Sequence, residues 1–176
     1  FMNAVQKILV PVDFSEDSAN GLRYAVSLAQ KTQAELVVLH VTQKEEADGF
    51  LDLLAMMEGA PTLNPPAGIP VDQLLHEKAL DLYHFVEKVV RNPGPLKIRR
   101  RVALGSKTEK IPGVAKEENI DLVVLAVQKQ SFLPYLMARG TLLKVISKMP
   151  CPVLLAPFFD VSWPRFGMIG SSLLAR

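Results

Sequence analysis

The chain has 176 residues, of which 49% are hydrophobic and 22% charged, so we expect one globular domain and exclude a disordered chain. Twenty basic and 18 acidic residues leave a net charge of +2, too small to indicate nucleic acid or an anionic membrane surface as a partner. One cysteine excludes an internal disulfide framework, the apolar runs are too short for a bilayer, and no basic-then-apolar segment opens the sequence, so we expect a cytoplasmic protein.

Strands and helices alternate from the start of the sequence. Residues 6–12, QKILVPV, form a short apolar run rich in β-branched residues, which predicts a buried strand. Asp13 follows, and Ser15 can cap the next helix, whose apolar residues recur at helical spacing. Residues 35–41, ELVVLHV, predict a second buried strand.

The segment 43–70 departs from this alternation. It begins with acidic residues, ends in four prolines, and contains FLDLLAMM at 50–57, a candidate short helix. Structureless segments of this length are unusual inside a compact domain. We therefore interpret 43–70 as an insertion between the second strand and the helix that follows.

The alternation resumes after the insertion. The patterns predict a helix over 71–90, a strand over 96–103, a helix over 107–118, a strand over 122–127, a helix over 140–148 and a strand over 152–156. Continuously apolar strands that alternate with helices are typical of an α/β fold, a five-stranded parallel sheet with helices on both faces. We expect one domain over residues 2–158 and a C-terminal tail over 159–176.

Ligands of open parallel sheets bind at the carboxyl ends of the strands, where the strand order reverses. Asp13 directly follows the first strand, and its carboxylate could accept a hydrogen bond from an adenine amino group or a ribose hydroxyl. A role in the turn alone is the alternative. Gly140 and Thr141 are predicted to open the last helix, where free N–H groups attract a phosphate, although Gly140 could also be a simple helix-entry residue. His40 is expected to be a partly buried structural residue.

No catalytic set is visible in the sequence. It contains no GxxxxGK[ST] loop, no GxSxG turn and no HExxH pair. The first strand is not followed by a glycine-rich turn, the main mark of ordinary dinucleotide-binding domains. Arg99, Arg100 and Arg101 are interpreted as a sheet edge or strand end that faces water. We therefore predict no catalytic and no metal-ligating residues.

Three stretches together resemble the universal stress protein family. These are KILVPVDFSEDSANGLRYAVSLA, ALGSKTEKIPGVAKEENIDLVVLAV and GTLLKVISKMPCPVLLAP, which cover residues 5–42 and 96–157. The resemblance implies a Rossmann-like, nucleotide-binding domain that usually forms a homodimer through its last strand. It also implies that ATP, ADP or AMP is held at the strand ends. The positions that it assigns to this site are Val12, Asp13, Val41, Gly105, Ala126, Val127, Gly140 and Thr141.

The phosphate-binding pattern of the family is G-x2-G-x9-G-[ST], and only the closing Gly-Thr pair at 140–141 matches it. Counting back from that pair places Val127 and Gln130 at the earlier glycines. Aligning from the fourth strand places Ala126 and Lys129 there instead. Because glycine lets backbone N–H groups approach a phosphate and adopt positive φ, these replacements predict that ATP binding is weak or lost.

Three functions remain open at this point. We favour a non-catalytic regulatory or stress-response domain that acts as a dimer and binds ATP weakly or not at all. The second is a domain that binds AMP, ADP or another adenosine compound through Asp13 and its neighbours. The third is a nucleotide-cleaving or adenylate-forming enzyme, whose first loop would be expected to read HxGH or SGGxDS, whereas this chain has VDFSED.

Overall fold

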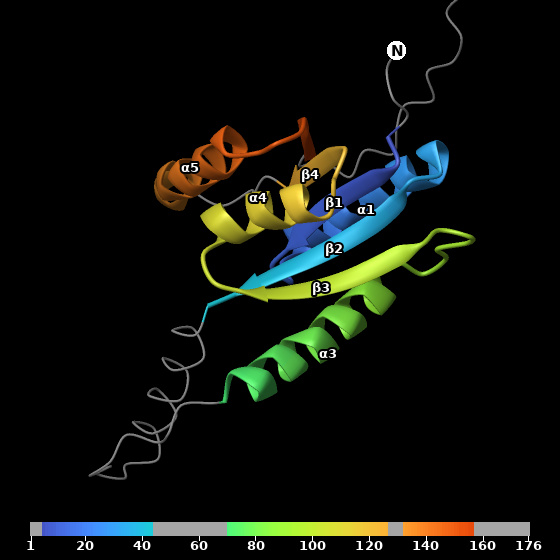
Figure 1. The fold of residues 1–176 in the computed structure, drawn as a ribbon, viewed down its shortest axis with the longest axis horizontal. Coiled ribbons are helices and arrows are strands. Elements are labelled where there is room, and N and C mark those ends of the chain that lie inside the picture. The colour runs from blue at the N-terminus through green and yellow to red at the C-terminus, as the bar shows by residue number, and fades with distance from the viewer. Residues whose placement is uncertain (1–4, 44–69, 127–131, 157–176) are drawn as a thin grey trace, which may run out of the picture.

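The fold is a single parallel sheet covered by helices (Figure 1). The computed structural model describes residues 5–43, 70–126 and 132–156. The strands are β1 (Lys7–Val12), β2 (Glu35–Thr42), β3 (Ile98–Leu104), β4 (Leu122–Ala126) and β5 (Val153–Ala156). The helices are α1 (Glu16–Thr32), α3 (Val71–Val89), α4 (Lys107–Glu117) and α5 (Phe132–Ser147). The helix expected at 50–57 and the tail 159–176 lie outside the described residues.

The strand order is β3-β2-β1-β4-β5, and every neighbouring pair is parallel. The predicted fold class is therefore confirmed. Parallel strands need a crossover between them, and the described helices α1, α3, α4 and α5 each lie, in chain order, between two strands of this sheet. No helix in the described part of the chain is long and apolar enough to cross a membrane.

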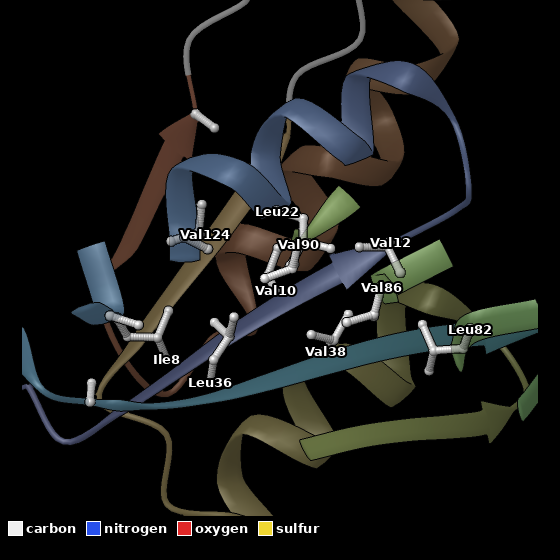
Figure 2. Packing of buried hydrophobic residues seen from close by; sticks show 14 residues of the cluster. Ile8, Val10, Val12, Leu22, Leu36, Val38, Leu82, Val86, Val90 and Val124 are labelled. Carbon is white, nitrogen blue, oxygen red and sulfur yellow. The ribbon is translucent and has the colours of Figure 1, made fainter. Parts of the chain in front are cut away.

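Successive side chains of each strand enter two different cores, because side chains alternate across a pleated sheet. Val10 of β1 and Val38 of β2 belong to the first core, which α1 and α3 cover (Figure 2). Leu9 and Val37 belong to the second core, together with residues of α4 and α5. Since both faces are covered, the inner strands need apolar residues at nearly every position, which explains their continuous apolar runs.

The outer strand β3 is apolar on one part of its length and charged on the other, as its three arginines predicted. Arg99 and Arg101 both donate to Glu118, whose side chain is only 8% exposed, at 2.7 and 2.8 Å. Arg100 pairs with Glu87 of α3 at 2.7 Å. Burial of the Glu118 carboxyl opposes its ionisation, but the hydrogen bonds from Arg101 and Arg99 hold its pKa below the usual value. These charges protect the edge from pairing with another strand.

Helix α5 differs from the prediction. It begins at Phe132, well before Gly140, so the expectation that Gly140 opens this helix is wrong. The sequence FLPYLMAR at 132–139 contains several good helix formers, and Pro134 lies in the first turn, where its missing N–H breaks no helical hydrogen bond. Gly140 and Thr141 therefore lie inside the helix rather than at its start.

A close contact between α1 and β4 depends on Gly21. A Cβ atom added at Gly21 would lie 2.9 Å from the Cβ of Ala126. We therefore expect Gly21→Ala to lower the free energy of unfolding by about 1–3 kcal/mol, as overpacking of a core does. Denaturant unfolding measures this change.

Gly113 provides the matched control, because it is also helical but a Cβ there would meet nothing within 4 Å. Gly113→Ala should be neutral or stabilise the protein by up to about 1 kcal/mol, the helix-propensity difference. Adding Ala126→Gly to Gly21→Ala should recover part of the loss. Equal effects of Gly21→Ala and Gly113→Ala would contradict the contact.

Candidate functional site

The strand order reverses between β1 and β4, because the chain moves outward from β1 to β3 and then returns to the other side of β1. Such a reversal is where ligands bind in open parallel sheets. Asp13 directly follows β1, and Ala126 is the last residue of β4. The fold therefore places the carboxylate predicted from the sequence at this reversal.

Other predicted site residues lie along the same edge. Val12 ends β1 and Val41 lies next to the end of β2, and both are buried. Gly105 directly follows β3, and its N–H donates to the carbonyl of Thr42 at 2.9 Å. The structure thus brings Val12, Asp13, Val41, Gly105 and Ala126 to one edge of the sheet.

The remaining predicted residues belong to the phosphate half of the site. Val127 lies outside the described residues. Gly140 and Thr141 are exposed within α5 rather than at its start. Inside a helix the N–H of Gly140 is not one of the free N–H groups that attract a phosphate at a helix start. The phosphate contact expected of a helix start is therefore not available at this pair.

Asp13 is held by the turn that connects β1 to α1. Its Oδ1 accepts from the N–H of Ser15 at 3.1 Å and from the Ser15 hydroxyl at 2.5 Å. Ser15 also caps α1, because its Oγ accepts from the N–H of Ser18 at 3.1 Å. The structural role of Asp13 in the turn, one of the two alternatives from the sequence, is therefore present. As expected, Ser15 caps the helix, and the same residue holds the Asp13 carboxylate by hydrogen bonds.

The Asp13 carboxyl is half-buried and ionised at neutral pH. Burial opposes its ionisation, but hydrogen bonds from Ser15 and Ser18 and the positive charge of Lys107 outweigh that effect and hold the pKa of Asp13 below its ordinary value. A fixed anionic acceptor at this edge suits a ligand that presents amino or hydroxyl donors.

The pKa shift has a consequence for stability. Because the pKa of Asp13 is lowered in the folded state, its contribution to stability is present above the unfolded value, about 3.9, and is lost as the pH falls through the folded value. We expect the difference in unfolding free energy between the wild type and Asp13→Asn to be constant from pH 5 to 7. It should shrink below about pH 4. A difference independent of pH from 7 to 3 would contradict the shift.

Gly105 has a backbone conformation that favours glycine, with φ of 136°. A Cβ atom at this position would lie 2.8 Å from Cε of Lys110. The Lys110 stem therefore lies against Gly105 at the start of α4. Both the positive φ and the contact with Lys110 favour glycine at position 105, whether or not a ligand binds nearby.

The Cβ atom of Ala126 faces α1, where Gly21 leaves space for it. The methyl group that replaces the first phosphate-loop glycine in one of the two alignments is thus accommodated by the helix. The other replacements, Val127, Lys129 and Gln130, lie outside the described residues. Within the described part of the chain, no three His, Cys, Asp or Glu side chains are grouped to hold a metal ion.

Sequence reasoning missed the role of Phe14. It has a φ of 64°, its ring is stacked on that of His40 with the ring centres 4.2 Å apart, and it touches Phe85 edge-on. His40 itself is buried and hydrogen-bonded, as expected of a structural histidine. The sequence shows an aromatic residue beside Asp13 but gives no sign of its left-handed backbone.

The family model of the universal stress protein family matches residues 4–157, and the chain belongs to this family. It is 26% identical over 152 residues to universal stress protein MJ0531 of Methanocaldococcus jannaschii, covering 86% of this chain and 82% of that protein. It is 27% identical over 157 residues to universal stress protein YxiE of Bacillus subtilis, covering 85% and 97% of the two chains.

Solved structures share the fold. The universal stress protein UspA of Lactobacillus plantarum aligns with a TM-score of 0.62 and 23% identity, over 88% of this chain and 99% of its own. A universal stress protein of Archaeoglobus fulgidus, solved in complex with dAMP, aligns with a TM-score of 0.57 and 17% identity, over 88% of this chain and 100% of its own. A universal stress protein solved in complex with cAMP also has a TM-score of 0.57 and 17% identity, over 87% and 97%.

Proposed function

We propose that this universal stress protein is a non-catalytic regulatory domain that binds an adenosine monophosphate at the Asp13 edge and binds ATP weakly or not at all. The observation that carries the proposal is the ionised, hydrogen-bonded Asp13 carboxylate at the reversal between β1 and β4. A carboxylate there can accept from an adenine amino group or a ribose hydroxyl. Val12 and Val41 supply apolar surface beside it.

The discrimination between AMP and ATP rests on the phosphate half of the site. Three phosphates need several backbone N–H groups at close range, which glycine-rich loops provide. This chain lacks two of the three glycines of the family pattern. A single phosphate needs fewer such contacts, and the cAMP and dAMP bound by two proteins of the same fold each carry one phosphate group.

Thermal unfolding with added nucleotide tests the proposal. AMP should raise the unfolding temperature more than ATP at equal concentration. A ligand present at a concentration one hundred times its dissociation constant raises the free energy of unfolding by about 2.7 kcal/mol. Asp13→Ala should abolish the AMP effect, whereas Asp72→Ala, which removes an exposed carboxylate at the start of α3, should leave it unchanged.

The phosphate loop can be tested in the same assay. Replacing Lys129 and Gln130 by glycine and removing one loop residue should raise the affinity for ATP if the loop is the obstacle. If wild-type protein binds ATP as tightly as AMP, the proposed discrimination is wrong. If neither nucleotide shifts the unfolding temperature at millimolar concentration, the binding proposal fails as a whole.

The proposal that the domain is not an enzyme rests on its residues. The turn after β1 holds Asp13 and Ser15, with the Ser15 hydroxyl donating to the carboxylate and accepting from Ser18. A nucleophilic hydroxyl needs a base that takes its proton, and an Asp with a lowered pKa is a weak base. Phosphate release from ATP that disappears in Asp13→Asn would instead support an enzyme.

We also propose that the domain forms a homodimer through β5. This strand is the outer one on its side of the described sheet, and parallel edges offer unpaired backbone groups. Leu155 of β5 is 45% exposed and Leu143 of α5 is 59% exposed, and large apolar side chains that face water favour a partner that covers them. A second copy of this chain would cover them.

Light scattering during gel filtration tests the dimer. The wild type should have twice the mass of one chain. Leu155→Glu should have the mass of a single chain, because the dimer interface would bury the new charge without a partner. Leu80→Glu is the control, since Leu80 of α3 is 48% exposed but lies away from β5. A wild type that is monomeric at high concentration would contradict the dimer.

A further inference from the structure

One side chain of β2 contacts the residues on both sides of Asp13. Nδ1 of His40 lies 2.9 Å from the carbonyl oxygen of Val12. A carbonyl oxygen only accepts, so Nδ1 carries the hydrogen and donates it. The ring of His40 is stacked on that of Phe14, with an interplanar angle of 23°. Asp13 therefore lies between two residues that the same imidazole holds.

The contact with Phe14 matters because of the backbone at that position. Phe14 has a φ of 64°, and a bulky residue with positive φ is uncommon and destabilising unless its surroundings hold it. The stacked His40 ring on one side and the edge of Phe85 from α3 on the other supply those contacts. The left-handed residue turns the chain from β1 toward the cap of α1 at Ser15.

The contact with Val12 fixes the other side of Asp13. The carbonyl of Val12 and the N–H of Asp13 belong to one planar peptide group. A hydrogen bond from His40 to that carbonyl therefore restricts the rotation of the peptide group, and with it the direction of the Asp13 side chain. His40 is buried, so solvent does not compete strongly for this hydrogen bond.

We infer that His40 is a positioning residue that aims the Asp13 carboxylate at the ligand, through its hydrogen bond to Val12 and its stack on Phe14. This inference rests on the proposed function, in which Asp13 receives the donors of an adenine nucleotide. Val41, the next residue of β2, enters the opposite core, so the end of one strand supplies both the positioning group and an apolar wall.

Two substitutions separate the two contacts. His40→Phe retains an aromatic ring for the stack and removes the donor. His40→Asn retains a donor near the place of Nδ1 and removes the ring. In each folded variant we expect AMP to bind about tenfold more weakly, the effect of one lost buried hydrogen bond or ring contact. His76→Asn on the exposed side of α3 is the control and should bind AMP like the wild type.

A second measurement, made without ligand, tests whether His40 positions the Asp13 carboxylate. The pKa of Asp13, followed by carbon NMR of its carboxyl group, should rise in both His40 variants because the carboxylate loses its alignment with the Ser15 donors. A residue that only fills the core would leave this pKa unchanged as long as the variant folds. If one variant does not fold, the other still gives both measurements.

The outcomes distinguish the two proposals. If both folded His40 variants keep the wild-type pKa of Asp13 and the wild-type AMP affinity, His40 is a packing residue and the inference is wrong. If the wild type binds no AMP but the pKa of Asp13 rises in the variants, His40 positions Asp13 and the proposed function is wrong. A rise in the pKa together with weaker AMP binding supports both.

Discussion

The burial of β1 on both faces is the constraint on which the rest of this structure depends. Ile8, Leu9 and Val10 are completely buried, and β1 pairs with β2 on one side and with β4 on the other. A strand held in this way cannot shift its register without moving its apolar side chains out of both cores. Its end is therefore a fixed point, and Asp13 is the first residue beyond it.

The edge of the sheet next to Asp13 has two unequal halves. On the β2 side, Ser15 holds the carboxylate by hydrogen bonds, and His40 contacts its two neighbours, through a hydrogen bond to the Val12 carbonyl and a stack on the Phe14 ring. On the β4 side, the methyl group of Ala126 packs into the space above Gly21. The first half is organised around a charged acceptor, whereas the second is organised around packing.

The two outer strands are also unlike each other. At β3, Arg99 and Arg101 share the nearly buried Glu118, so the edge is covered by paired charges. At β5, Leu155 is 45% exposed. Paired charges oppose the approach of another strand, and exposed leucines favour a partner that covers them. In the proposed homodimer, β5 would be the edge used for association, whereas β3 is the edge covered by charges.

The sequence by itself determined the strands, the alternation with helices and the parallel sheet, because continuous apolar runs have no stable place except between two covered faces. It also placed Asp13 directly after β1, since a strand and the residue that follows it are neighbours in the chain. Only the tertiary structure decided that α5 begins at Phe132 and that His40 holds both neighbours of Asp13. Those contacts join residues of different elements, and local sequence patterns carry no record of which side chains the packing brings together.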